Sequence, residues 1–152
     1  MGPKAGVCVF CDALKRDARE AMVLYRGDHS FLMLNKYPYI NGHLLVAPAR
    51  HAGCITELDA DDNCTLMTMV AAATAIVKTH LNPDCFNIGC NIGAVAGAGI
   101  ADHIHVHIVP RWDGDHNFIT VISELRTIPE HIEATFDRLA PDFLDLHRKR
   151  NP

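Results

Sequence analysis

Three histidines stand at alternate positions of residues 102–112, DHIHVHIVPRW, and branched apolar residues separate them. Because successive side chains of a β-strand point to opposite faces, His103, His105 and His107 are predicted to project from one face of a sheet. The apolar side chains of the segment then turn to the other face and enter the core: Ile104, Val106 and Ile108. A merely solvated face would be served equally well by threonine, lysine or glutamate. The segment therefore predicts a strand with a reactive face, because imidazole acts as nucleophile, acid, base or metal ligand near neutral pH.

Hydrophobic periodicity and turn residues predict the other elements of the fold. The predicted strands are residues 22–25, 30–35, 43–48, 86–91 and 102–112. Gly27-Asp28 is typical turn chemistry, which favours an antiparallel pairing of the first two strands. A long helix is predicted from Asp59, its N-cap, to about Leu81, and a C-terminal helix over about 129–147. This order predicts an α+β fold, a mostly antiparallel five-stranded sheet with a long central helix and a C-terminal helix packed on it.

Length, composition and charge indicate how many domains the chain forms and which kinds of partner it binds. With 152 residues, 49% of them hydrophobic and 21% charged, we expect a single domain over residues 1–152 with its core over about 8–125. A net charge of −4 gives no general attraction for nucleic acid. No apolar run approaches the roughly 20 residues of a membrane span, and residues 1–6 lack the apolar stretch of a secretory signal. We therefore expect a cytoplasmic protein with mostly reduced cysteines and with neither a nucleic-acid nor a membrane partner.

A glycine-rich loop leads into the histidine segment. Residues 89–100, GCNIGAVAGAGI, contain four glycines among twelve positions. Glycine lets the backbone turn its N–H groups toward a ligand, which is how loops cradle anionic oxygens, although many such loops are only tight turns. Because the loop adjoins His103, Gly97 and Gly99 are candidates for binding a phosphate.

Together these segments resemble the histidine-triad (HIT) superfamily. The resemblance is carried by residues 35–48, NKYPYINGHLLVAP, by the glycine-rich loop and by residues 103–112, HIHVHIVPRW. It spans most of residues 8–125, and the extension PRWDGDHNF is similar to the branch that contains bacterial diadenosine tetraphosphate phosphorylases and hydrolases. The resemblance implies nucleotidyl transfer at an α-phosphate by a homodimer, with a nucleotide as substrate. We expect no organic cofactor.

The predicted site residues follow partly from chemistry and partly from the resemblance. A neutral imidazole attacks phosphorus in line when a backbone carbonyl holds its other nitrogen protonated, so the central His105 is the predicted nucleophile. The resemblance implies a nucleotidyl-histidine intermediate on His105, released by water or phosphate, with His107 and His43 on the phosphate oxygens. It also implies that Asn91 holds the ligand and that Asn35 binds the ribose. A core role for His43 and a turn-capping role for Asn35 are the alternatives.

One position departs from the family pattern. Many relatives carry glutamine at the leaving side of the phosphate, just before the triad strand, where this chain has Gly99. We therefore expect backbone N–H groups of the loop to contact the leaving group, with His103 or Trp112 as further contributors. Trp112, the only tryptophan, is also a candidate for stacking on a base or sealing a dimer, and core packing is the alternative.

Cys8 and Cys11 form a C-x-x-C pair, which suits zinc if two further ligands such as histidines come close. His51 is the obvious third ligand. In zinc-bearing relatives the ligands match Cys8, Cys11, His51 and His103, so the resemblance implies a structural zinc that fastens the N-terminus onto the catalytic strand. Two reduced, buried thiols without a metal are the alternative.

Several functions compete. The first is a hydrolase or phosphorylase of dinucleoside polyphosphates such as diadenosine tetraphosphate, and an adenosine 5′-monophosphoramidase is the enzymatic alternative. A zinc hydrolase with all three triad histidines on one ion is disfavoured, because alternate strand residues lie about 6.6 Å apart at Cα and do not converge easily on one ion. A nucleotide-binding protein without turnover is the last possibility.

Overall fold

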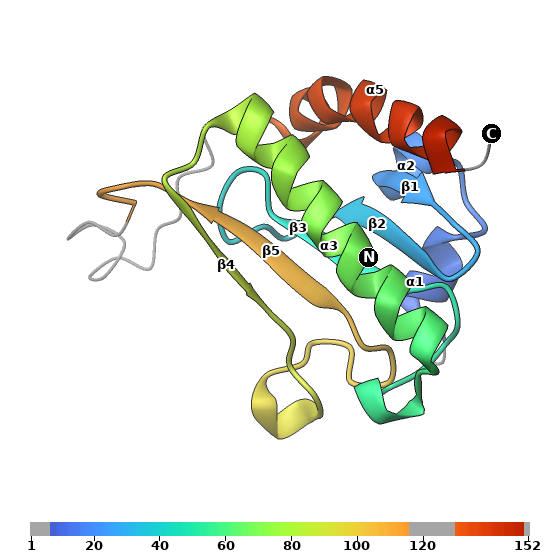
Figure 1. Cartoon of the computed structure of the whole chain (residues 1–152). Helices are drawn as coiled ribbons and strands as arrows, with labels where there is room; N and C mark the ends of the chain where they lie inside the picture. The colour runs from blue at the N-terminus through green and yellow to red at the C-terminus, as the bar shows by residue number, and fades with distance from the viewer. Residues whose placement is uncertain (1–6, 116–129, 151–152) are drawn as a thin grey trace.

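The computed structural model describes residues 7–115 and 130–150 and is built around a five-stranded antiparallel sheet (Figure 1). The strands lie in the order β1-β2-β3-β5-β4. Their bounds are Val23–Arg26 (β1), Ser30–Leu34 (β2), Leu44–Pro48 (β3), Cys85–Gly89 (β4) and Val106–Arg111 (β5). The predicted α+β class is confirmed, and each predicted strand is found. The predicted antiparallel pairing of the first two strands is also confirmed, with Tyr25 opposite Leu32.

Helix α3, Ala60–Leu81, runs across one face of the sheet (Figure 1). The Asp59 side chain caps it by accepting the N–H of Asp62 at 2.8 Å, as predicted, and Asn82 ends it in the left-handed conformation. With a mean hydropathy of 1.3 over 18 residues, α3 is long and apolar enough to cross a membrane, which the sequence analysis did not anticipate. Its buried side chains nevertheless recur at helical spacing and belong to the core: Leu66, Met69, Val70, Ala73 and Val77. α3 is therefore the core helix of this fold.

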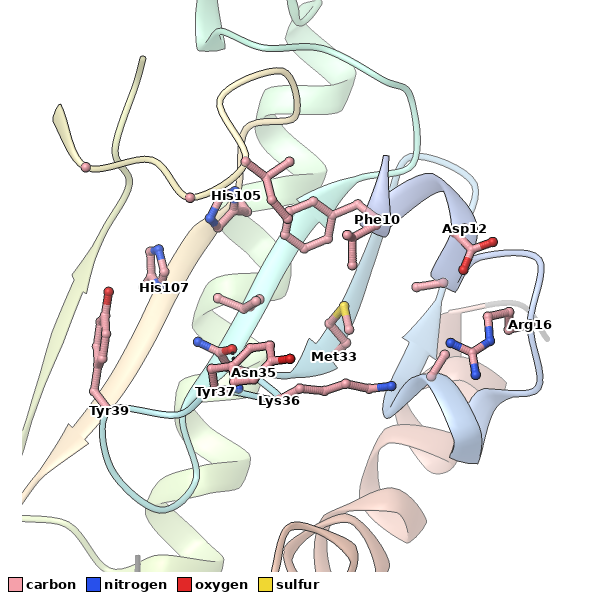
Figure 2. Close-up of a pocket in the computed structure, with 17 residues that line it drawn as sticks. Phe10, Asp12, Arg16, Met33, Asn35, Lys36, Tyr37, Tyr39, His105 and His107 are labelled. Carbon is pink, nitrogen blue, oxygen red and sulfur yellow. Dashed lines mark hydrogen bonds between the residues drawn. The ribbon is translucent and has the colours of Figure 1, made fainter. Parts of the chain in front are cut away.

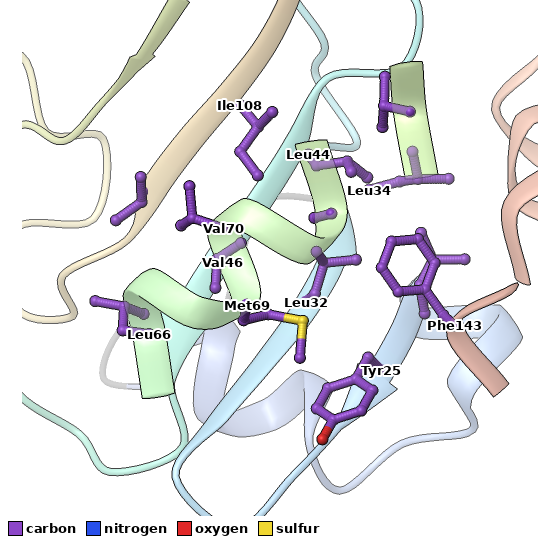
Figure 3. Close-up of a cluster of buried hydrophobic side chains, with 14 of the residues drawn as sticks. Tyr25, Leu32, Leu34, Leu44, Val46, Leu66, Met69, Val70, Ile108 and Phe143 are labelled. Atoms are coloured by element: carbon purple, nitrogen blue, oxygen red, sulfur yellow. The ribbon is translucent and has the colours of Figure 1, made fainter. Parts of the chain in front are cut away.

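Helix α5, Ile132–Arg150, lies beside α3 over the same face of the sheet (Figure 1). Its Leu139 and Phe143 are fully buried in the main hydrophobic cluster (Figure 3). The predicted C-terminal helix is thus confirmed, and it continues three residues beyond its predicted end at 147. Its predicted start at residue 129, and the predicted core limit at residue 125, lie outside the described residues.

The opposite face of the sheet carries two short helices that the sequence analysis missed, α1 (Val9–Ala13) and α2 (Ala18–Ala21). Phe10 of α1 is buried in a second, smaller cluster with strand residues such as Phe31 and Leu45. Helices of four or five residues have no amphipathic period to detect, and packing rather than propensity holds them. The local signal was Asp17, whose side chain caps α2. Met22, predicted to begin β1, instead ends α2 at φ 59°.

The histidine segment is shorter as a strand than predicted. β5 begins at Val106, so His103 and His105 precede it. The ladder with β3 stops at Val46 opposite Val106, and Pro48, two residues farther along β3, has no N–H to extend it. Ile104 instead donates its N–H to the carbonyl of Ala52 at 2.7 Å.

The predicted alternation of side chains holds throughout this segment. The apolar members enter the main core cluster beneath α3: Ile104, Val106 and Ile108. The histidines therefore face the opposite side of the sheet, toward α1.

Candidate active site

A cavity of about 510 Å³ lies on the α1 face of the sheet, between α1, the segment after β2 and the glycine-rich loop (Figure 2). Several predicted site residues line it: Asn35, Gly97, Gly99, His105 and His107. The remaining predicted residues lie outside its lining: Cys8, Cys11, His43, His51, Asn91, His103 and Trp112. A pocket of this size with a largely apolar wall and a few converging polar groups suits a small-molecule ligand.

His105 has the geometry of a nucleophile. Its Nδ1 lies 2.9 Å from the backbone oxygen of His103, and a carbonyl only accepts, so Nδ1 carries the proton and Nε2 keeps its lone pair. Burial lowers the pKa of His105, which favours the neutral ring. The Phe10 ring, with its centroid 4.8 Å away, covers the imidazole. The backbone carbonyl that was expected to hold the second nitrogen of His105 is therefore that of His103, two residues earlier.

His107 and His43 form a hydrogen-bonded pair whose proton positions are also determined. The backbone N–H of Tyr39 donates to His43 Nδ1 at 3.1 Å, so this nitrogen accepts and His43 Nε2 carries the proton. His43 Nε2 lies 2.9 Å from His107 Nδ1, which must then accept. His107 Nε2 is left as an N–H donor. Burial, and secondarily the neighbouring His107, lowers the pKa of His43 to about 3, so this tautomer persists at neutral pH.

His43 is fully buried and lies outside the cavity lining, and its direct contact with a phosphate stays a prediction. It lies behind His107 and orients that ring, while His107 lines the cavity. The ring of Tyr39 lies against the same pair, nearly parallel to His107 at 17° with a centroid separation of 6.0 Å. This geometry suits His43 to orient His107.

Asn35 makes the turn-capping bond that the sequence analysis left open, and its contact with a ribose stays a prediction. Its Oδ1 accepts the backbone N–H of Tyr37 at 3.0 Å, which is a turn-capping bond. Its Nδ2 lies 3.3 Å from His43 Nδ1 and adds a second donor to that nitrogen. Since Asn35 also lines the cavity, it joins the cavity wall to the histidine pair.

The glycine-rich loop closes over the histidine end of the cavity. It contains the 3-10 turn η2, Ala94–Ala96, which ends at Gly97 with φ 87°, a left-handed conformation that favours glycine. A Cβ at Gly97 would lie 3.6 Å from the Asn91 side-chain nitrogen. The Asn91 side chain therefore lies beside Gly97 within the loop, outside the cavity lining.

Trp112 directly follows β5, at the end of that strand remote from His107. It is half-buried, and its backbone N–H donates to Asp115 at 3.2 Å, beside the ion pair of Arg111 with Asp115. The fold of one chain therefore does not bring Trp112 to the triad.

Four potential metal ligands meet on the α1 side of the sheet, at the start of the histidine segment. The ligand atoms of Cys8, Cys11, His51 and His103 all lie within 4.8 Å of one another. His103 Nε2 donates to the carbonyl of Pro48 at 2.9 Å, so its Nδ1 lone pair faces the thiols, 3.3 Å from Cys8 Sγ and 3.6 Å from Cys11 Sγ. Two sulfurs and two imidazole nitrogens in one tight cluster are a donor set that suits tetrahedral zinc. The cluster therefore fits the metal that the resemblance implies.

A comparison with known families agrees with this geometry. The profile of the HIT domain matches residues 16–114. The chain belongs to the HIT family. An AP-4-A phosphorylase of Mycobacterium tuberculosis is 40% identical over 134 residues, which cover 88% of this chain and 69% of that protein.

Solved structures of HIT proteins share the fold. A hypothetical histidine triad nucleotide-binding protein from Sulfolobus tokodaii has a TM-score of 0.74 and 31% identity over 93% of this chain and 95% of its own. A Zn-bound histidine triad family protein from Mycobacterium smegmatis has a TM-score of 0.73 and 25% identity, over 93% of this chain and 96% of its own.

Two residues that line the site of this HIT protein, Phe10 and Tyr39, were not among those predicted from the sequence. Phe10 lies between the two cysteines, and in this structure the approach of Cys8 and Cys11 to His103 accompanies the contact of Phe10 with the triad. Its position between the cysteines was the signal present in the sequence. Tyr39 lies within segment 35–48, which resembles the family. Its contact with His107, however, depends on the pairing of β3 with β5, which are far apart in the sequence.

Proposed function

We propose that this protein cleaves dinucleoside polyphosphates of the diadenosine tetraphosphate type at the α-phosphate, through a nucleotidyl-His105 intermediate, by hydrolysis or phosphorolysis. The observation that carries the proposal is the single hydrogen bond from His105 Nδ1 to the His103 carbonyl, because it leaves the Nε2 lone pair available to attack phosphorus. The 40% identity to an AP-4-A phosphorylase supports the substrate class.

The reaction proceeds in two displacements. In the first, His105 Nε2 forms a bond to the α-phosphorus, and the bond from phosphorus to the bridging oxygen of the leaving nucleotide breaks, with the electron pair going to that oxygen. In the second, water or inorganic phosphate attacks the same phosphorus, and the bond to His105 breaks. The N–H of His107 Nε2 donates to a phosphate oxygen, where negative charge grows in each transition state.

The nucleoside occupies the apolar part of the cavity. Phe10, Met33 and Leu45 supply an apolar wall for the base, and Asn35 lies within the same lining as a polar partner for the ribose. This placement leaves the α-phosphate at the histidine end, beneath Gly97 and Gly99, whose backbone N–H groups suit anionic oxygens.

A structural zinc would be held by Cys8, Cys11, His51 and His103. When bound, the ion supplies rigidity rather than a reaction step. His103 provides the carbonyl that holds His105, and Phe10 between the cysteines covers the same ring, so both supports of the nucleophile adjoin the cluster. A cytoplasmic location, which we also propose, keeps the thiols reduced and able to bind metal.

We further propose a homodimer formed through β4. Among the strands of residues 7–115 and 130–150, β4 is an edge of the sheet and pairs with β5, and its residues are mostly exposed. Ile88 on β4 and Ile92 beyond it are 46% and 43% exposed. An open edge with apolar side chains is a template for pairing with a second chain. Sedimentation of the wild type and of Ile88→Lys tests this: a dimer that Ile88→Lys dissociates supports it, and a wild-type monomer refutes it.

The products of diadenosine tetraphosphate, with and without inorganic phosphate, test the proposed activity. ATP with AMP indicates hydrolysis, ATP with ADP indicates phosphorolysis, and the absence of turnover refutes the proposal. If adenosine phosphoramidate is cleaved far more efficiently, the phosphoramidase alternative holds instead. Substrate labelled at the α-phosphate should leave an acid-labile label on the wild type and none on His105→Ala, and equal labelling of both proteins would exclude His105 as the nucleophile.

A further inference from the structure

The leaving half of the substrate needs a contact that the predicted residues do not provide. Gly99 stands where many relatives carry glutamine, so the loop offers only backbone groups there. His103 is fully buried, with Nε2 bonded to the Pro48 carbonyl and Nδ1 facing the thiols. Trp112 lies outside the cavity lining. Neither of the side chains expected to compensate for the missing glutamine is therefore in place.

Cationic side chains do not fill this role among the described cavity residues. Lys36 and Arg16 line the cavity but extend toward its opposite end (Figure 2). Lys36 Nζ donates to the carbonyl of Glu20 at 3.0 Å, and Arg16 lies 3.6 Å from the Glu20 carboxylate. The histidine end is thus lined by neutral donors in the part of the chain that the structure describes.

Tyr39 is the hydroxyl-bearing side chain beside His107. Its ring is nearly parallel to the His107 ring, and its own backbone N–H holds His43, so its position is tied to the histidine pair. The residue is 52% exposed, which places part of it at the open side of the site. Figure 2 shows its hydroxyl on the His107 side of the cavity, remote from Asp12 and Arg16.

We propose that the Tyr39 hydroxyl donates a hydrogen bond to the polyphosphate of the leaving nucleotide. The inference rests on the proposed function. As His105 Nε2 bonds to the α-phosphorus, the bridging oxygen departs with the electron pair of the broken bond, and the hydroxyl keeps its proton while it stabilises the new negative charge. Tyr39 thereby takes the place of the missing glutamine and favours leaving groups that carry phosphate oxygens.

Two substrates with the same nucleoside separate this role from a structural one. Diadenosine tetraphosphate expels a polyphosphate, whereas the p-nitrophenyl ester of AMP expels p-nitrophenolate, a stable anion without phosphate oxygens. Tyr39→Phe should lower kcat/KM for diadenosine tetraphosphate by about 10- to 100-fold, the range for a lost hydrogen bond to a charged group, and change that for the ester by less than about threefold. The affinity for AMP, which has no leaving half, should stay the same.

Tyr25→Phe is the matched control. It removes the same hydroxyl from a tyrosine in the core on the opposite face of the sheet, beneath α5 (Figure 3). It should leave the ratio of the two kcat/KM values unchanged.

Two results with Tyr39→Phe would overturn the assignment. One is wild-type kcat/KM for diadenosine tetraphosphate, and the other is an equal loss with both substrates, because that would show an effect through His107. If the wild type cleaves the ester but not diadenosine tetraphosphate, the proposed function itself fails and the role of Tyr39 fails with it.

Discussion

Lowering the pH from 7 to 5 should destabilise this protein, and one buried ring, His43, should make a separable contribution. The folded chain holds His43 neutral, with a pKa of about 3 because of burial and the adjacent His107. In the unfolded chain the same imidazole returns to its ordinary pKa of 6.5. Since the folded pKa is the lower one, protons bind preferentially to the unfolded chain. The stability contributed by the neutral ring is therefore complete well above pH 6.5 and is lost as the pH falls from 6.5 toward 3.

The magnitude follows from the width of that window. Each pH unit between the two pKa values costs about 1.4 kcal/mol of unfolding free energy. At pH 5 the solution lies about 1.5 units below the unfolded pKa, so His43 alone should cost about 2 kcal/mol relative to pH 7. This is a large share of the roughly 5–15 kcal/mol by which domains are stable.

Urea unfolding of the wild type and of His43→Gln at both pH values, at equal metal content, isolates this contribution. Glutamine does not titrate, and its amide N–H is able to donate to His107 Nδ1. The other histidines are common to both proteins, so their contributions cancel in the comparison. The unfolding free energy of the wild type should fall by about 2 kcal/mol more than that of the variant. Equal losses in the two proteins would refute the reasoning, because they would show that His43 is not held neutral by the fold.

Three further perturbations test the site and the fold. His105→Ala should abolish turnover of diadenosine tetraphosphate while AMP affinity stays within about tenfold, measured by calorimetry, because the cavity wall remains. Chelation of the metal, or Cys11→Ser, should weaken AMP binding and lower Tm, because α1 carries Phe10 into the cavity; unchanged AMP affinity would contradict this link. Asp62→Asn should lower the unfolding free energy by about 1–3 kcal/mol in urea titrations, because the buried Asp62 carboxylate accepts hydrogen bonds from His29 and Arg50.

The orientation of His105, the proposed nucleophile, could be predicted because it depends on local geometry. Alternation along residues 103–108 places the histidines opposite Ile104, Val106 and Ile108 whatever the rest of the chain does. The hydrogen bond from His105 to the carbonyl of His103 spans only two residues. The long helix, too, follows from its own periodicity and from the Asp59 cap.

The supports of that nucleophile could not be derived from local pattern, because they join residues far apart in the sequence. The register of β3 against β5 places Leu45 opposite His107 and thereby brings His43 behind that ring. The predicted strand 102–112 is shorter in the structure because Pro48, on the neighbouring strand β3, has no N–H with which to extend the pairing.

The residues themselves therefore determined which face of the sheet carries the histidines and which of them is the central one, since a strand's two-residue period needs no partner. The tertiary structure alone decided what holds that side chain. It brought Cys8 to within 3.3 Å of His103 across 95 positions, set Phe10 over His105, and placed Tyr39 beside His107. The physical reason is that such contacts arise from strand register and core packing, which are properties of the whole fold.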